Sequence, residues 1–212
     1  MIRKAILSLS FFFWASLAQA EVVIAALGDS LTQGFGLFEE DGFVPQLERW
    51  LKDAGHDVQV MNAGVSGDTT SGGLSRVDWT LGDQVDAMIV ALGGNDLLRG
   101  IDPALSRENL TGILEKAGAR GVEVLLIGME APGNYGPDYK TAFDSIYPQL
   151  AAEYGTVYLE SFFVGFGEAQ DDWEAVLALM QPDGIHPNAE GVAKIVEGVG
   201  PKVVELITRV GS

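Results

Sequence analysis

Residues 22–30 read Val22-Val23-Ile24-Ala25-Ala26-Leu27-Gly28-Asp29-Ser30, and this stretch decides the fold. Its first six residues are apolar and include three β-branched side chains, which is typical of a strand buried on both faces of a parallel sheet. A glycine and two polar residues follow, so we expect the strand to end there in a loop. The stretch therefore predicts a central parallel strand that carries an aspartate and a serine to one edge of a sheet.

The rest of the chain continues this alternation of strand and helix. We expect strands at 58–61, 87–92, 122–127 and 157–159, and helices at 43–54, 70–77, 103–119, 139–154 and 189–210. The alternation predicts an α/β fold of three layers, α/β/α, in which helices cover both faces of a parallel sheet. Five strands suggest the flavodoxin-like order 2-1-3-4-5. We see no internal repeat or linker, so residues 21–212 are expected to form a single domain.

Four polar clusters follow strands or precede the last helix. Because the carboxyl ends of parallel strands meet at one edge of the sheet, where open α/β sheets bind ligands, we expect the clusters to converge there. His56 precedes a strand and should lie at the opposite edge, which leaves His186 as the remaining one of two histidines. The clusters are Gly28-Asp29-Ser30, residues 62–69, Gly93-Gly94-Asn95-Asp96 and Asp183-Gly184-Ile185-His186-Pro187.

Ser30, His186 and Asp183 supply the three groups that convert an alcohol into a nucleophile. A serine hydroxyl attacks, an imidazole takes its proton, and a carboxylate holds the imidazole in the correct tautomer. Alternatively, Ser30 begins a helix as its N-cap, and Asp183 or Asn188 caps the last helix. A metal site is a further reading of Asp-x-x-His, but the chain offers no cysteine and no third histidine as ligands. We therefore expect no metal and no cofactor.

Acyl transfer also requires hydrogen-bond donors that face the developing oxyanion. The candidates are the backbone N–H groups of Ser30 and Gly67 and the side-chain amide of Asn95. Glycine allows a backbone N–H to approach a substrate closely, and asparagine donates without a charge of its own. Each of the latter two residues is also an ordinary turn residue. It is the expected convergence of all four clusters at one edge that favours a catalytic site.

These four clusters, in this order and spacing, resemble the four blocks of the GDSL or SGNH hydrolases, and the resemblance covers essentially the whole of 21–212. The nearest likeness is to the bacterial thioesterase I, lysophospholipase L1 and arylesterase group. The resemblance implies Ser30, Asp183 and His186 as the triad, and Ser30, Gly67 and Asn95 as the oxyanion hole. It also implies a mobile segment over the acyl chain after the fourth strand, which makes Pro132, Asn134 and Tyr135 candidate substrate contacts; a connecting loop is the plain alternative.

The first twenty residues have the pattern of a bacterial secretory signal peptide. Arg3 and Lys4 precede an apolar run at 5–17, and Ala18-Gln19-Ala20 matches an A-x-A cleavage site. The run is too short for a comfortable membrane span, and an uncleaved membrane anchor is the alternative. We therefore expect removal of 1–20, a periplasmic or secreted protein, and no stable membrane span after cleavage.

The formal net charge of −17 argues against two classes of partner. A strongly acidic surface repels nucleic acid and anionic membranes, and the sequence contains no basic stripe. The expected partner is a small ester or lipid substrate, whereas the oligomeric state is not predicted. The acidity agrees either with an ordinary exported protein or with adaptation to salt.

Together these features predict a serine esterase that acts through an acyl-enzyme on aryl or short- to medium-chain acyl esters, with thioesters and lysophospholipids as further substrates. A carbohydrate O-acetylesterase with the same catalytic residues is the alternative. A non-catalytic ligand-binding module is the rival from another class, but Gly34-Phe35-Gly36 lacks the full glycine pattern of a nucleotide-binding loop.

Overall fold

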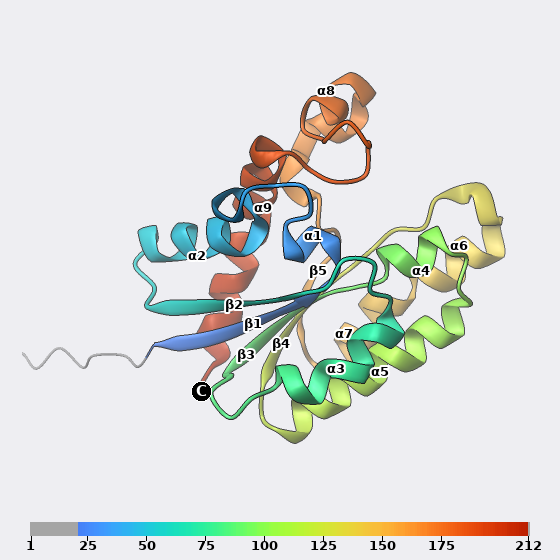
Figure 1. Cartoon of the computed structure of the whole chain (residues 1–212). Coiled ribbons are helices and arrows are strands. Elements are labelled where there is room, and N and C mark those ends of the chain that lie inside the picture. Colours follow the sequence, from blue (N-terminus) through green and yellow to red (C-terminus); the bar gives the residue numbers. More distant parts are fainter. Residues whose placement is uncertain (1–20, 212) are drawn as a thin grey trace, which may run out of the picture.

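The computed structural model describes residues 21–211, and the predicted leader, residues 1–20, lies outside the described residues. Five parallel strands form one sheet in the order β2-β1-β3-β4-β5, which confirms the predicted fold (Figure 1). The strands are β1 (Val22–Gly28), β2 (Val58–Gly64), β3 (Ala87–Ala91), β4 (Glu123–Ile127) and β5 (Val157–Leu159). Within the part of the chain described, no helix combines the length and apolarity needed to cross a bilayer.

The register of the sheet aligns the carboxyl ends of three neighbouring strands. β1 pairs in parallel with both β2 and β3, so that Gly28 lies beside Gly64 on one side and beside Ala91 on the other. Each of these residues ends its strand. The chain therefore leaves three neighbouring strands at the same level, and the loops that follow them meet at one edge.

Helices cover both faces of the sheet (Figure 1). The hydrophobic core on one face contains residues of α2 and α9, and the core on the other contains residues of α3, α5, α6 and α7. Their bounds are α2 (Phe43–Asp53), α3 (Thr70–Thr80), α5 (Pro103–Ala119), α6 (Pro137–Asp144), α7 (Ile146–Tyr154) and α9 (Ala189–Arg209).

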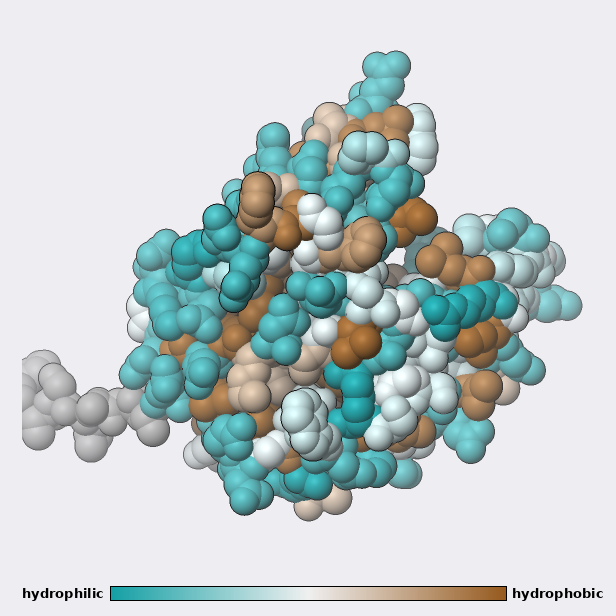
Figure 2. Space-filling model, in the orientation of Figure 1, coloured by the Kyte–Doolittle hydropathy of each residue, from teal (hydrophilic) through white to brown (hydrophobic). Residues whose placement is uncertain are grey.

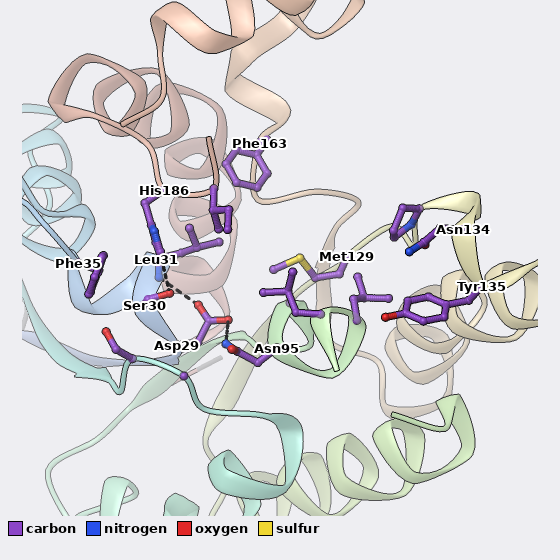
Figure 3. A pocket seen from close by; sticks show the side chains of 17 residues that line it. Asp29, Ser30, Leu31, Phe35, Asn95, Met129, Asn134, Tyr135, Phe163 and His186 are labelled. Carbon is purple, nitrogen blue, oxygen red and sulfur yellow. Dashed lines mark hydrogen bonds between the residues drawn. The ribbon is translucent and has the colours of Figure 1, made fainter. Parts of the chain in front are cut away.

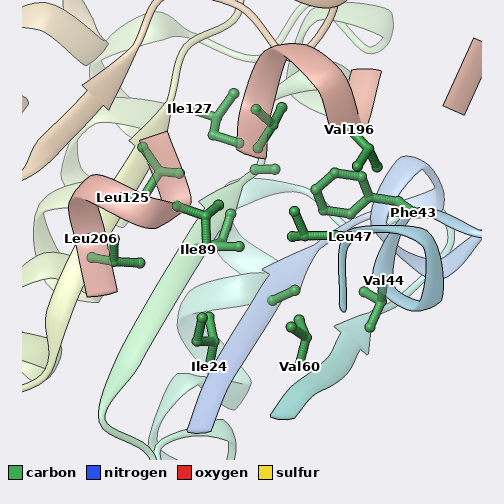
Figure 4. Packing of buried hydrophobic residues seen from close by; sticks show 14 of the residues in the cluster. Ile24, Phe43, Val44, Leu47, Val60, Ile89, Leu125, Ile127, Val196 and Leu206 are labelled. Carbon is green, nitrogen blue, oxygen red and sulfur yellow. The ribbon is translucent and has the colours of Figure 1, made fainter. Parts of the chain in front are cut away.

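The side chains of β1 divide between these two cores. Ile24 and Ala26 belong to the core under α2 and α9, whereas Ala25 and Leu27 belong to the other. Figure 4 shows Ile24 and Ile89 of the sheet in the same packed cluster as Leu47 of α2. The burial of β1 on both faces explains why its sequence is a continuous apolar run rather than an alternating one.

The prediction of one helix over 139–154 was wrong, because two helices occupy this part of the chain. α6 ends at Asp144 and α7 begins at Ile146, with Ser145 between them. Pro148 has no N–H, so it cannot donate to the carbonyl four residues earlier, which is that of Asp144. Proline in the first turn of α7 is well tolerated, since the first N–H groups of a helix lack helical partners.

Several short elements were not predicted. β2 extends to Gly64, because pairing with β1 continues through residues expected to be a loop. The added helical segments are α1 (Ser30–Gln33), α4 (Gly94–Leu98), α8 (Trp173–Ala178) and the 3-10 turns η1 (Glu39–Asp41), η2 (Gly133–Tyr135) and η3 (Val164–Asp171). Such short segments carry too few residues for a periodic pattern.

Candidate active site

Ser30 is the first residue of α1, and only Asp29 separates it from the end of β1. The N-cap of this short helix is Asp29, whose carboxylate accepts the N–H of Leu31 at 3.0 Å. The alternative role of Ser30 as the N-cap is therefore wrong. Its hydroxyl instead lies 2.8 Å from Nε2 of His186 (Figure 3). Residues separated by most of the chain thus meet at the predicted edge.

Asp183 holds His186 from the other side of the ring. Its Oδ2 lies 2.7 Å from Nδ1 of His186, and its Oδ1 accepts the backbone N–H groups of Ile185 and His186 at 2.9 and 3.0 Å. The backbone bond from His186, followed by the bond from its ring, lowers the pKa of the Asp183 carboxyl to about 2. Asp183 is therefore ionised near neutral pH and keeps a proton on Nδ1, which leaves Nε2 free to accept the proton of Ser30.

The loop that carries His186 has its own supports, so Asp183 is not needed as a helix cap. Asn188 is the N-cap of α9 and accepts the N–H of Gly191 at 2.9 Å. The N–H of Gln181 donates to the carbonyl of His186 at 2.7 Å. The alternative in which Asn188 caps the last helix is thus confirmed, and it leaves both oxygens of Asp183 to the histidine loop.

Asn95 lies on α4, beside the pair formed by Ser30 and His186. Its Nδ2 donates to Oδ2 of Asp29 at 3.2 Å (Figure 3). Because an amide nitrogen carries two hydrogens, this bond leaves the second available to a ligand in the cavity that Asn95 lines. Asp29 is almost fully buried, and this burial raises the pKa of its carboxyl despite the bonds it accepts. Asp29 therefore orients the amide of Asn95.

The turn before Asn95 requires glycine. Gly93 has φ +125°, and a Cβ there would lie only 2.0 Å from the hydroxyl oxygen of Tyr147. That hydroxyl donates to the carbonyl of Leu92 at 2.8 Å and so fixes the end of β3. The positive φ and the close approach explain why glycine stands at position 93.

Gly67 is the candidate backbone donor from the second cluster. It has φ +82°, which favours glycine, and it lines the same cavity as Ser30 and Asn95. Its carbonyl accepts a bond from Nη2 of Arg99 at 2.8 Å. Arg99 follows α4, so this bond joins the loop of Gly67 to the helix that carries Asn95.

The side chains of Asp96 and Arg76 connect the loops that carry Ser30, Gly67 and Asn95. Asp96 is fully buried and accepts the N–H and hydroxyl of Thr70, at 2.9 and 2.6 Å, and the hydroxyl of Ser106 at 2.9 Å. Arg76 donates to the carbonyl of Gly28 at 2.8 Å and to Asp68 at 2.6 Å. The three loops that hold Ser30, Gly67 and Asn95 are therefore tied together by charge-assisted hydrogen bonds.

A cavity of about 540 Å³ opens above these residues. Its remaining walls are mostly apolar, and Figure 2 shows hydrophobic residues on both sides of a hollow near α8 and α6. The predicted substrate contacts Pro132, Asn134 and Tyr135 all line it. In Figure 3, Asn134 and Tyr135 lie on the side away from His186. Further lining residues are Leu31, Phe35, Leu97, Leu98, Met129, Phe163 and Ile185. Among residues 21–211, no group of three or more His, Cys, Asp or Glu side chains could hold a metal ion.

Sequence reasoning missed several of these residues. Asp29 stood in a quoted cluster without a role, and Arg76 was not considered, although both make bonds across at least 48 positions of the chain. No local pattern indicates such long-range partners. Phe35 was considered only in a nucleotide loop, yet its ring centroid lies 4.6 Å from that of His186. A signal for it was available, because an aromatic residue five positions after Ser30 is close to the reactive serine.

At the edge of a flavodoxin-like sheet, a serine hydroxyl contacts an imidazole that is held by a carboxylate. This arrangement defines a site of the serine hydrolase type. Comparisons with known proteins agree. Residues 26–194 match the GDSL-like Lipase/Acylhydrolase family. The chain therefore belongs to this family.

Individual relatives cover almost the whole chain. It is 39% identical to "Esterase TesA" of Pseudomonas aeruginosa in an alignment of 189 residues, and this alignment covers 89% of this chain and 90% of that protein. It is 36% identical to "Arylesterase" of Vibrio mimicus, over 97% of this chain and 99% of the relative. The crystal structure of AlinE4, described as a SGNH-hydrolase family esterase, superposes with a TM-score of 0.71 at 41% identity, over 88% of this chain and 97% of that one.

Replacement of Asn95 by alanine is expected to lower kcat about 100- to 1000-fold with little change in KM, because an oxyanion donor acts mainly in the transition state. Steady-state kinetics with p-nitrophenyl butyrate measures both constants. The control is Asn62→Ala, which removes an exposed amide on β2 outside the cavity. An Asn95→Ala enzyme with unchanged kcat and raised KM would instead make Asn95 a ground-state contact.

The lowered pKa of Asp183 predicts a pH dependence of stability. Its carboxyl has an ordinary value near 3.8 in the unfolded chain and about 2 in the folded one. The ionised group thus stabilises the fold above pH 3.8, and this contribution is lost as the pH falls to 2. We expect the melting temperature of the wild type to exceed that of Asp183→Asn at pH 6, by a margin that shrinks between pH 4 and pH 2. Thermal denaturation followed by circular dichroism tests this, and a margin independent of pH would contradict it.

Proposed function

We propose that the chain is a serine esterase that hydrolyses carboxylic esters with aryl or short- to medium-chain acyl groups. The observation that carries the proposal is the 2.8 Å contact between Oγ of Ser30 and Nε2 of His186, whose other ring nitrogen is held by ionised Asp183. Family membership and the esterase relatives support the same activity.

The reaction proceeds in two halves. Ser30 attacks the acyl carbonyl carbon while Nε2 of His186 takes the hydroxyl proton, and the carbonyl oxygen becomes an oxyanion. The N–H groups of Ser30 and Gly67 and the amide of Asn95 stabilise that charge. The intermediate collapses, the bond to the alcohol oxygen breaks, and His186 returns the proton to that oxygen. Water then attacks the acyl-enzyme with His186 as base, and the acid leaves.

The apolar walls of the cavity favour an acyl chain over a sugar. Leu97, Leu98 and Met129 line the cavity together with the candidate contacts Pro132 and Tyr135. Thioesters and lysophospholipids fit the same chemistry, and a carbohydrate O-acetylester is the competing substrate. Acyl-CoA is disfavoured as the natural substrate, because its phosphates would meet a surface with a formal net charge of −17.

The proposal includes export. The basic start, the apolar run and the A-x-A site at 18–20 support a leader that is cleaved near Ala20, and therefore a periplasmic or secreted enzyme. Expression of the full chain in a Gram-negative bacterium, followed by fractionation and N-terminal sequencing, tests this. A cytoplasmic protein that retains Met1 would contradict it.

The decisive experiment for activity is a substrate panel with the purified chain 21–212. We expect turnover of p-nitrophenyl esters with a chain-length optimum, together with lower rates on acetylated xylan. Butyryl-thiocholine and lysophosphatidylcholine report thioesterase and lysophospholipase activity. A fluorophosphonate should label Ser30 alone, as found by peptide mass spectrometry. If esters are not hydrolysed and Ser30 is not labelled, the proposal fails.

A further inference from the structure

The Ser30–His186 pair divides the cavity into two sides. Met129 and Tyr135 lie on one side in Figure 3, and Phe35 lies on the other. The side of Met129 and Tyr135 also contains Asn134, in the segment after β4. Phe35 belongs to the loop after α1, and its ring packs against the imidazole at a centroid distance of 4.6 Å with a tilt of 37°.

The chemistry assigns a different part of the ester to each side. In acylation, Nε2 of His186 must reach the alcohol oxygen to return its proton as the carbon–oxygen bond breaks. The alcohol therefore leaves next to the imidazole, where Phe35 is found. The acyl chain stays bound to Ser30 and extends toward the apolar wall that contains Met129.

Phe35 is held in place although it is not part of the core. Phe35 is 47% exposed, so an apolar residue beside His186 remains open to a ligand. Its N–H donates to the carbonyl of Ser30 at 3.1 Å, and its carbonyl accepts Nε2 of Gln181 at 2.8 Å. The same nitrogen of Gln181 also donates to the carbonyl of Pro187 at 2.9 Å. Gln181 thus joins the loop of Phe35 to the loop of His186, and an open aromatic face is presented beside the base.

We propose that Phe35 forms the binding subsite for the alcohol part of the ester and makes the enzyme selective for aromatic alcohols. An aromatic alcohol packs its ring against the exposed face of Phe35 while its oxygen receives the proton from His186. Aromatic pairs gain attraction beyond their buried area, which an aliphatic ring of the same size does not share. This inference rests on the proposed esterase function, and it adds a specificity determinant to it.

The test compares two esters of matched size and reactivity, benzyl butyrate and cyclohexylmethyl butyrate, in the wild type and in Phe35→Leu. Leucine keeps apolar bulk against His186 and removes only the aromatic face. We expect kcat/KM for the benzyl ester to fall about three- to tenfold, while the value for the cyclohexylmethyl ester stays within about twofold. Phe38→Leu is the matched control, because Phe38 is 79% exposed, three positions further on, and outside this cavity.

The rate of deacylation distinguishes a role of Phe35 in binding the alcohol from a role in positioning His186. The alcohol has left before deacylation, so a subsite for the alcohol predicts an unchanged deacylation rate in Phe35→Leu. This rate is measured from the steady state that follows the burst with p-nitrophenyl butyrate. Equal losses on both esters with slower deacylation, or no loss on either, would overturn the role. A wild type that hydrolyses none of these esters would instead refute the esterase proposal itself.

Discussion

Replacement of Ser30 by alanine should reduce the hydrolysis of p-nitrophenyl butyrate by at least about 10⁴-fold, down to the small residual rate that binding and oxyanion donors provide. The reason is chemical rather than structural. The hydroxyl of Ser30 lies 2.8 Å from Nε2 of His186, and alanine removes this hydroxyl but keeps the backbone N–H that begins α1. The variant should therefore fold normally, with a melting temperature close to that of the wild type, and should no longer react with a fluorophosphonate.

Ser66→Ala is the matched control for this experiment. Ser66 lines the same cavity, but its hydroxyl donates to the side chain of Gln33 and not to an imidazole. We expect its kcat to stay within a few-fold of the wild type. Unchanged turnover in a purified, folded Ser30→Ala protein would remove Ser30 from the mechanism, and loss of turnover in Ser66→Ala instead would point to a different nucleophile.

The convergence of Ser30 and His186 could be predicted because it depends on strand topology. In a parallel sheet with strands in the order β2-β1-β3, loops after neighbouring strands must meet at the carboxyl edge. The apolar run of β1 and the Gly-Asp-Ser that follows it therefore locate the serine before any coordinates are known. His186 follows by elimination, because His56 precedes β2 at the opposite edge.

The bonds that orient the site could not be predicted, because they depend on side-chain partners far apart in sequence. Arg76 lies on α3 and donates to the carbonyl of Gly28 at 2.8 Å, across 48 positions of the chain. The amide of Asn95 donates to Asp29 across 66 positions. Hydrophobic periodicity indicates which face of an element is buried, but it contains no information on which polar atoms pair at its end.

The break between α6 and α7 illustrates the same limit at short range. Residues 139–154 read as one helix by their composition, and only the missing N–H of Pro148 marks the interruption at Ser145. Proline within a helical pattern can either kink a helix or begin a new one. Phe143 of α6 and Ile146 of α7 are buried in the same core on either side of the break.

Replacement of Asp183 by asparagine should lower kcat about 10⁴-fold while the protein remains folded. Asparagine retains an oxygen that can accept the N–H groups of Ile185 and His186, so the loop is expected to keep its shape. What is lost is the charge next to Nδ1 of His186. An amide either offers a neutral acceptor, which stabilises the imidazolium less, or donates to Nδ1 and so places the proton on Nε2, where it prevents that nitrogen from acting as base.

The kinetics of Asp183→Asn separate this orienting role from a simple loss of fold. KM should change little, because Asp183 lies behind the imidazole and does not line the cavity. Labelling of Ser30 by a fluorophosphonate should slow in parallel with kcat, since both reactions require deprotonation of the serine by His186. Asp172→Asn is the matched control, because this carboxylate accepts the N–H of Glu174 as the N-cap of α8, outside the cavity. If Asp183→Asn retains more than a tenth of the wild-type kcat while Ser30→Ala is inactive, then the imidazole is positioned by its loop and by Phe35, and the carboxylate is not the group that makes His186 an effective base.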